Sequence, residues 1–287
     1  MMKIPKKIHQ IYTKGINELP KEILASVEKL KEMNPQWEYF FYDEKIIIEY
    51  IDRNYGKEML SLYLSIDPKY GAARADLFRY LLIYIEGGIY LDIKSSCLIP
   101  LDDAIAEDCE ILLCSWDNKA CGCDKNMGIH KELSFLKCGE YQQWNITSVP
   151  GSPYIKSAID EVIYRLKNYK PWIYGVGMKG VLNTTGPVPF SVGIEKINKT
   201  EFFHHEENHR NIGLKYRNVT EGIIMKYNRN HYSKLKDSIV ILEGKDKLYY
   251  KLWLFFIYPL QRLKKNIINE SKGIIRKMKR IFCEKSQ

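Results

Sequence analysis

Three polar residues in the first third of the chain have the types and spacing of a ligand-binding centre. Asp76 and Arg79 are three residues apart, so on a helix they share one face. Asp92 ends the apolar string Ile89-Tyr-Leu, and Lys94 follows two residues later. Alone, Asp76 and Arg79 would form an ordinary intrahelical ion pair, which stabilises a helix by roughly a few tenths of a kcal/mol. Beside an acidic strand end, they indicate that polar groups converge on one cleft.

A second candidate centre is the string His205-Glu-Glu-Asn-His209, which matches the zinc-protease pattern H-E-x-x-H. Its inner residues are polar where a buried zinc-binding helix would carry apolar ones. The nearest third ligand, Glu221, follows Gly213 and an expected chain break. We therefore interpret the string as a solvated, charged loop and keep a zinc protease as a minor alternative. P-loop and serine-hydrolase motifs are absent from the sequence.

The cysteines favour a reducing compartment. They number seven, an odd count, and their spacing forms no paired zinc-ligand pattern. The first residues carry no long apolar segment, so we expect neither a signal peptide nor a membrane-spanning anchor there.

The elements before the Asp76 centre alternate between strand and helix. Residues 7–12 and 37–42 are strand-like, and between them apolar residues at helical spacing predict a helix over 23–33. Helical residues 43–50 follow. This strand, helix, strand order favours a parallel pair of strands.

The centre itself is predicted to lie on a helix and on the strand that follows it. Residues 72–86 are good helix formers, Gly87-Gly88 ends the helix, and 89–93 favour a strand. Asp92 is therefore expected at the carboxyl end of a central strand, the edge where open α/β sheets bind ligands. The remaining predicted elements are strands at 111–116 and 145–149, a helix at 154–167 and a loop that begins at Thr185-Gly-Pro187.

Several ordered motifs make this sequence similar to a known family, the DxD-type sugar transferases, which includes yeast initiating mannosyltransferases and lactosylceramide galactosyltransferases. The resemblance covers most of the chain from Ile4 to about Val240. It is carried by Ile4-Pro-Lys-Lys-Ile-His-Gln-Ile-Tyr12, Asn34-Pro-Gln-Trp-Glu-Tyr39, the block from Arg74 to Asp92, Pro150-Gly-Ser-Pro153 and Thr184-Thr-Gly-Pro187. It implies a GT-A fold, a nucleotide-sugar donor and formation of the glycosidic bond with retention of configuration.

The resemblance also implies roles for individual residues. Tyr12 takes the place of an aromatic residue that stacks on the nucleotide base. Asp76 and Arg79 match a pair that hydrogen-bonds the hydroxyls and phosphate of the donor. Tyr90 and Asp92 match the start of the Tyr-x-Asp-x-Asp motif, in which the first acid touches ribose, sugar or metal. Asp76, Arg79 and Asp92 are thus the predicted catalytic residues, with Tyr12, Tyr90 and Lys94 as further donor-binding residues.

Lys94 departs from the family pattern, because it stands where the second acid ligates Mn²⁺. An ammonium group cannot ligate a metal ion. Either Asp92 and a downstream residue such as His231 hold Mn²⁺, or Lys94 itself neutralises the leaving diphosphate. A third possibility is loss of activity, which would leave a sugar-nucleotide or carbohydrate-binding protein.

The positive charge of the chain is concentrated at its end. Of 44 Lys/Arg and 35 Asp/Glu, 12 and 3 lie between 245 and 287, which leaves 32 of each sign before that segment. Such a distribution argues against nucleic acid as a partner. Leu248 to Leu260 is apolar and aromatic but too short to span a bilayer, and basic residues follow it. We expect this tail to lie on an anionic membrane surface, which would make the protein cytoplasmic and peripherally membrane-associated.

Together these features predict an α/β fold: a GT-A-type, Rossmann-like mixed sheet with flanking helices over 1–244, and a basic amphipathic tail over 245–287. The predicted function is a retaining glycosyltransferase in glycan or polysaccharide synthesis. It would move a sugar from a UDP- or GDP-sugar to a hydroxyl of a glycan or glycolipid.

Overall fold

The computed structural model describes residues 2–218, 232–260 and 263. Within these ranges the chain divides into two compact units. The first comprises the described residues of Met1–Tyr169 and Ile173–Ile241, and the second comprises Lys170–Trp172 with the described residues from Leu242 onward. The first unit carries the sheet and the candidate site. The domain boundary that the sequence predicts after Gly244 remains a prediction.

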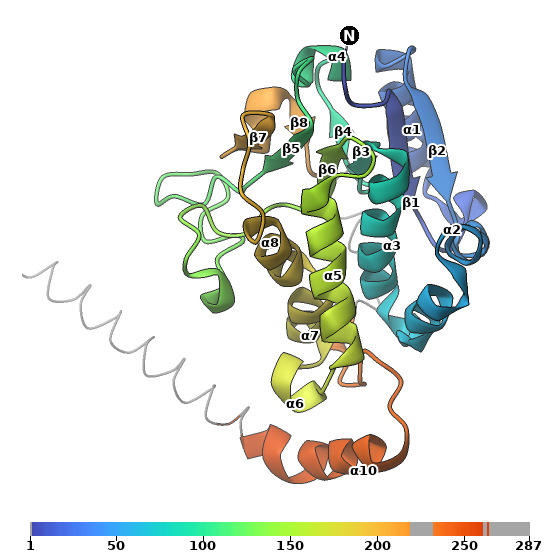
Figure 1. Cartoon of the computed structure of the whole chain (residues 1–287), viewed down its shortest axis with the longest axis vertical. Helices are drawn as coiled ribbons and strands as arrows, with labels where there is room; N and C mark the ends of the chain where they lie inside the picture. Colours follow the sequence, from blue (N-terminus) through green and yellow to red (C-terminus); the bar gives the residue numbers. More distant parts are fainter. Residues whose placement is uncertain (1, 219–231, 261–262, 264–287) are drawn as a thin grey trace, which may run out of the picture. The chain divides into compact units, whose positions relative to one another are not determined.

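The first unit is built on a six-stranded mixed sheet in the order β2-β1-β3-β6-β5-β7 (Figure 1). β1 pairs in parallel with β2 and β3, and β5 pairs in parallel with β7. β6 runs antiparallel to both β3 and β5, so β3 and β5 end at the same edge. The strands are β1 Lys7–Ile11, β2 Glu38–Tyr42, β3 Gly88–Leu91, β5 Ile111–Cys114, β6 Asn145–Ser148 and β7 Phe203–Glu206, with a separate small sheet of β4 Ser96–Cys97 and β8 Leu214–Lys215.

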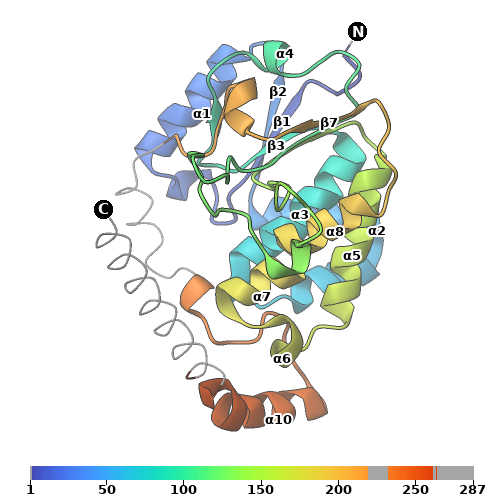
Figure 2. The same ribbon diagram turned by 90° about the vertical axis from the view of Figure 1, so that its left-hand side faces the viewer.

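Helices surround this sheet, and Figure 2 shows α3, α5, α7 and α8 gathered together beneath it. α2 is interrupted at Gly56, where φ is 77°. The helices of this unit are α1 Lys21–Met33, α2 Glu44–Ser65, α3 Gly71–Glu86, α4 Leu101–Ala104, α5 Pro153–Lys167, α7 Gly177–Thr184 and α8 Pro187–Glu195, and α6 Pro171–Tyr174 begins in the second unit.

Alternation along the strands gives the sheet two different faces. Ile8, Ile89 and Leu91 join a core cluster that includes Leu30 of α1. The intervening residues face α2 and α3, because His9 bonds to Tyr42 and the Tyr42 ring meets Phe78 of α3 at 5.4 Å. Tyr90 alternates with Ile89 and Leu91, and so shares the face that carries the Asp76 and Arg79 side chains.

The predicted α/β class and mixed sheet are confirmed. The loop predicted from Thr185-Gly-Pro187 is wrong, because Pro187 begins α8. The charged loop predicted over 205–209 is also wrong: His205 lies in β7, and His209 begins the short 3₁₀ helix η4, His209–Ile212. A strand at the edge of a sheet keeps one side in water, which explains its polar composition.

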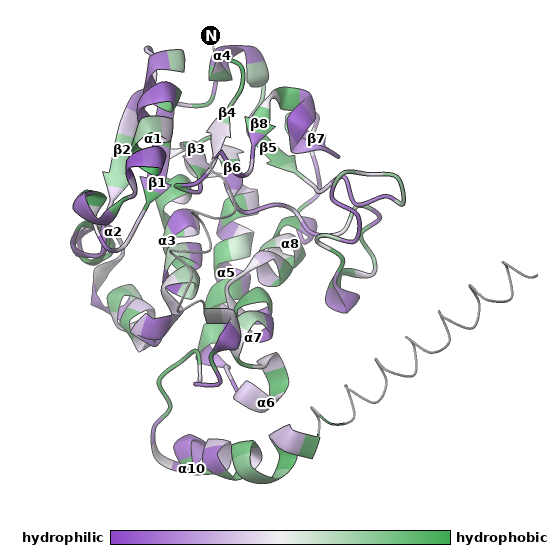
Figure 3. Ribbon diagram, turned by 180° about the vertical axis from the view of Figure 1, so that it is seen from behind, coloured by the Kyte–Doolittle hydropathy of each residue, from purple (hydrophilic) through white to green (hydrophobic). Residues whose placement is uncertain are grey.

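The second unit contains α10, Gly244–Leu252, continued by the π-helical turn η6, Trp253–Ile257. Hydrophobic and hydrophilic residues mix along α10 in Figure 3. Trp253 is buried, whereas Phe255 is 76% and Leu260 66% exposed. No helix among the described residues has both the length and the apolar character needed to cross a membrane.

Candidate donor-binding site

Two glycines set the geometry between α3 and the site. Gly87 and Gly88 both have positive φ, at 62° and 86°, and they turn the chain from α3 directly into β3. A Cβ on Gly88 would lie 2.5 Å from the Lys7 carbonyl oxygen, so only glycine lets β3 approach β1 here. Beyond β3, the Asp92 amide donates to the Trp144 carbonyl at 2.8 Å. Asp92 is thus held at the carboxyl edge of the sheet.

The three residues that the sequence predicts as a centre do come together with Lys94. The Arg79 guanidinium lies between two carboxylates, 2.9 Å from Oδ1 of Asp76 and 3.5 Å from Oδ1 of Asp92. Lys94 Nζ lies 3.7 Å from Oδ2 of Asp92. The side chains of Asp76 and Arg79 are 4% and 7% exposed, whereas those of Asp92 and Lys94 are 21% and 29% exposed. Asp92 and Lys94 therefore present the accessible groups, and Asp76 and Arg79 lie behind them.

Tyr90 holds the Asp92 side chain in place through a hydrogen bond. Its hydroxyl donates to Oδ1 of Asp92 at 2.9 Å, and the Arg79 guanidinium lies 4.7 Å from the centre of its ring. This cation–π contact and the hydrogen bond bring Arg79 and Asp92 to the same side chain. Burial raises the pKa of Tyr90 well above its usual value, so its hydroxyl stays a donor.

Asp76 is a buried carboxylate whose charge is costly. Burial raises its pKa to about 6, although the Arg79 guanidinium and the Thr185 hydroxyl both act to lower it. Thr185 Oγ1 donates to Oδ2 of Asp76 at 2.9 Å. The charge on Asp76 is therefore sensitive to pH near neutrality.

Lys94 is held in its charged form. Burial lowers its pKa, but the Asp92 carboxylate and Tyr216 outweigh this effect, so that its pKa is raised above the usual value. Its ammonium group also lies 5.0 Å from the centre of the Tyr216 ring. The Lys94 carbonyl accepts from the Asn218 amide at 2.8 Å, which ties this segment to the one after β8.

Two predicted site residues remain, Tyr12 and His231. Tyr12 follows β1, and its side chain packs against a cluster of Leu19, Ile23 and Val27. The stacking of Tyr12 on a nucleotide base stays a prediction. His231 lies outside the described residues.

The described residues do not fit a divalent metal at Asp92. One oxygen of this carboxylate faces Arg79 and the Tyr90 hydroxyl, and the other faces Lys94. A Mn²⁺ ion would enter beside two fixed cations, with Asp92 as its single acidic ligand. No group of three potential metal ligands occurs among the residues that the structure describes. A metal here would need ligands from outside them, such as His231.

Sequence reasoning missed four residues that shape the site. Gln10 Nε2 donates to the Asp92 carbonyl at 3.1 Å, and Arg79 Nη1 donates to the Gln143 carbonyl at 2.6 Å. Thr185 bonds Asp76, and Tyr216 lies under Lys94. Only Gln10 and Thr185 lie in motifs that carry the resemblance, so these two had a sequence signal. Gln143 and Tyr216 reach the site through long-range folding.

The H-E-x-x-H string does not form a zinc site. His205 Nε2 pairs with Ser115 Oγ at 2.9 Å, and His209 Nδ1 with Gln142 Nε2 at 3.0 Å. The two histidines lie on different elements, not on one helical face. The zinc-protease alternative lacks the helix that its mechanism requires.

Part of the chain that carries the candidate site is similar in sequence to known proteins. Residues 20–111, which include Asp76, Arg79 and Asp92, match the family described as "glycosyltransferase sugar-binding region containing DXD motif". Inositol phosphoceramide mannosyltransferase 3 of Schizosaccharomyces pombe is 34% identical over 34% of this chain and 26% of its own length. The initiation-specific alpha-1,6-mannosyltransferase of Candida albicans is 27% identical over 65% of this chain and 51% of its own length.

These matches span about a quarter and a half of the two relatives. Among solved structures, PaToxG glycosyltransferase aligns over 80% of this chain and 86% of its own, with 16% identity and a TM-score of 0.43. The family match covers the helix, the glycine turn and the strand that build the site. Residues 20–111, about a third of this chain, are thus similar to the sugar-binding region of the DXD-motif glycosyltransferases.

Proposed function

We propose that the chain is a retaining glycosyltransferase of GT-A type that transfers a sugar from a UDP- or GDP-sugar to a hydroxyl of a glycan or glycolipid. One observation carries the proposal: Asp92 and Lys94 lie partly exposed at the carboxyl edge of β3, backed by the buried Asp76–Arg79 pair, within the family's sugar-binding region. The two mannosyltransferases among the relatives favour mannose as the transferred sugar.

In this proposal each group has its own role. Asp92 accepts hydrogen bonds from hydroxyls of the donor. Arg79 and Tyr90 hold Asp92 in place and act as positioning residues, because both are buried. Asp76 holds Arg79 in turn. Such a preorganised set loses little entropy when the donor binds.

Lys94 supplies positive charge where the diphosphate leaves. As the bond between the sugar and the phosphate oxygen breaks, its electron pair stays on the diphosphate, and the ammonium group stabilises that charge. The acceptor hydroxyl attacks from the same face and gives its proton to a phosphate oxygen, which retains the configuration. This route needs no carboxylate nucleophile.

Donor hydrolysis by the purified chain tests the proposal. We expect one UDP- or GDP-sugar to be hydrolysed, with Asp92→Ala abolishing the reaction. If Lys94 supplies the charge, EDTA leaves the activity intact and Lys94→Ala lowers kcat by about 100-fold, a loss typical of a removed charge-stabilising group. Lys94→Asp should then respond to added Mn²⁺. Wild-type activity that EDTA abolishes would reject Lys94 as the replacement for a metal.

A second candidate function follows from the contact between Lys94 and Asp92. An ion pair at 3.7 Å would also remain in a decayed site that binds a sugar nucleotide without cleaving it. Calorimetric titration with UDP, GDP and their sugars separates the two functions: binding without turnover supports the decayed site, and turnover excludes it.

We also propose that the tail contacts an anionic membrane surface, which would bring the site to a membrane-bound acceptor on the cytoplasmic side. The exposed apolar residues of the second unit support this proposal. The basic residues that follow them in the sequence, such as Arg276, Lys277, Lys279 and Arg280, supply the complementary charge.

A further inference from the structure

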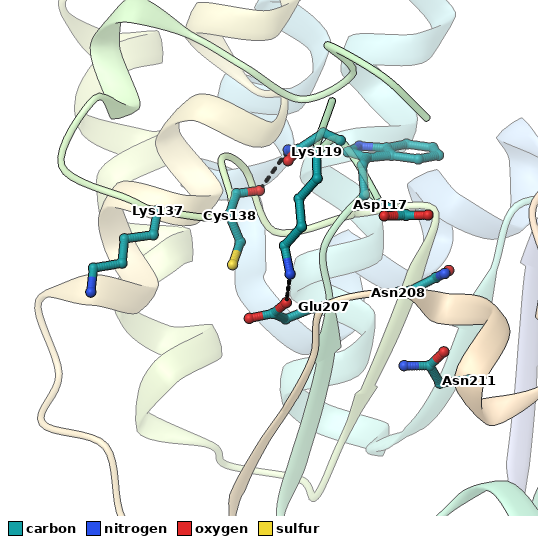
Figure 4. A pocket seen from close by; sticks show the side chains of 9 residues that line it. Asp117, Lys119, Lys137, Cys138, Glu207, Asn208 and Asn211 are labelled. Carbon is teal, nitrogen blue, oxygen red and sulfur yellow. Dashed lines mark hydrogen bonds and ion pairs between the residues drawn. The ribbon is translucent and has the colours of Figure 1, made fainter. Parts of the chain in front are cut away.

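A polar pocket of about 220 Å³ opens beyond the ends of β5 and β7 (Figure 4). β5 ends at Cys114 and β7 at Glu206, and these two residues are paired in a parallel register. Since β3 and β5 end at the same edge of the sheet, the pocket and Asp92 share that edge. The lining residues are Trp116, Asp117, Asn118, Lys119, Lys137, Cys138, Glu207, Asn208 and Asn211.

The lining has the chemistry of a site for a neutral, hydroxyl-rich ligand. Two carboxylates and two ammonium groups balance each other, and Lys119 pairs with Glu207 at 2.5 Å (Figure 4). Such a balance gives no advantage to a phosphate or an amine. Three side-chain amides complete the wall. An amide both donates and accepts hydrogen bonds, as a sugar hydroxyl does.

Internal hydrogen bonds hold two of these amides in place. The Asn118 NH₂ group donates to the carbonyls of Met127 at 3.1 Å and Cys138 at 2.8 Å. The side-chain oxygen Oδ1 of Asn208 accepts a hydrogen bond from the backbone amide of Arg210 at 3.0 Å. These bonds use opposite ends of the two amides, which leaves an acceptor on Asn118 and a donor on Asn208 for a ligand. A site with fixed polar groups loses less entropy on binding.

A single aromatic side chain connects the pocket with the proposed donor site. Trp116, in the pocket wall, meets the ring of Tyr216 edge-on at 5.0 Å. The Lys94 ammonium lies 5.0 Å from the centre of the same Tyr216 ring and 3.7 Å from Asp92. Only β6 separates β3 from β5, so their ends lie about 10 Å apart. An extended saccharide can reach across this distance.

We propose that the pocket is an acceptor subsite that binds one neutral sugar ring, while the neighbouring ring of the same saccharide presents its hydroxyl to the donor near Asp92. This inference rests on the proposed function and extends it, because it assigns acceptor recognition to residues after β5 and β7. Of the three amides, Asn211 makes the fewest side-chain hydrogen bonds within the described chain, a single long one with Glu206 at 3.4 Å, so its removal should disturb the fold little.

The test compares two acceptors, methyl α-D-mannopyranoside and α-1,6-mannobiose, in wild type and Asn211→Ala. We expect the variant to raise the KM for mannobiose about fivefold, the effect of one lost hydrogen bond, and to change the KM for the monosaccharide and for the donor much less. Glu207→Gln, which weakens the ion pair across the pocket, should act in the same direction. Asn54→Ala, an exposed asparagine on α2, is the matched control and should change neither KM.

An unchanged KM for mannobiose in both pocket variants would overturn the proposal. Calorimetric titration of mannobiose into wild type and Asn211→Ala measures binding of the saccharide to the pocket without catalysis. If wild type hydrolyses no donor, the proposed function fails. Mannobiose binding that Asn211→Ala weakens would still support the pocket, and equal or absent binding to both proteins would reject it.

Discussion

The side chains of the candidate site form a graded series from interior to surface. Asp76 and Arg79 are nearly buried, and Asp92 and Lys94 are partly exposed. The sequence indicated this set because helix spacing places Asp76 and Arg79 together and a strand end exposes Asp92. It did not indicate which members face solvent, because their burial also depends on Thr185 and Gln143, which come from two distant segments of the chain.

The raised pKa of Asp76 predicts that activity falls on the acid side of the pH profile, which we call the acid limb. Asp76 pairs with Arg79 as the carboxylate, and this form is lost as the pH falls through about 6. We therefore expect kcat/KM for donor hydrolysis to fall about tenfold per pH unit below 6. Asp76→Asn should be less active, and its profile should be flat in this range.

Asp160→Asn is the matched control, because Asp160 is exposed and forms an ion pair with Lys156 on its own helix. It should keep the acid limb. A limb that persists in Asp76→Asn would assign the titration to another group.

Among the elements, α3 and β3 were predictable because their sequence is locally unambiguous. Good helix formers end at Gly87-Gly88, and a short apolar strand follows. α8 was misread as a loop because it contains Pro187, Pro189 and Gly193. Its prolines lie in the first helical turn, where an amide has no intrahelical partner. Gly193 lets α8 approach α5, since a Cβ there would lie 2.4 Å from Ala158 Cα. Tertiary packing, which local propensity does not include, decides this segment.

The junction between α3 and β3 predicts a strong effect of Gly88→Ala. An added Cβ would lie 2.5 Å from the Lys7 carbonyl oxygen, and alanine would also be strained at a φ of 86°. We expect a loss of at least about 2 kcal/mol in the free energy of unfolding, or about 4–8 °C in Tm. Activity should fall more than stability requires, because β3 carries Asp92.

Gly151→Ala separates the two causes. Gly151 also has a positive φ, of 71°, but a Cβ there meets no atom within 4 Å. It should therefore lose only the backbone cost, about 1–2 kcal/mol. Calorimetric unfolding of both variants makes the comparison, and equal losses would show that the contact with β1 carries no cost of its own.

At the scale of the whole molecule, charge and apolar exposure are separated along the sequence. The first 244 residues carry equal numbers of acidic and basic groups, whereas the last 43 carry a large basic excess. The described part of the second unit exposes Leu248, Phe255, Phe256 and Leu260. Composition alone predicted this division of charge, since it needs no knowledge of folding. The sequence could not show that Trp253 is buried while its neighbours are exposed.

This separation predicts salt-sensitive binding to anionic vesicles. We expect the full chain to sediment with vesicles that contain phosphatidylserine, and a chain that ends at Gly244 to stay in the supernatant. Each basic residue near such a surface contributes about 1 kcal/mol to the binding free energy. Because salt screens this attraction, binding should weaken sharply between roughly 0.1 and 0.5 M NaCl. Phe255→Ser with Phe256→Ser should weaken the binding that remains at high salt, because that part depends on apolar burial.

Equal sedimentation of the full and shortened chains would place the membrane contact elsewhere. Binding to neutral vesicles alone would show that the basic residues do not drive the association.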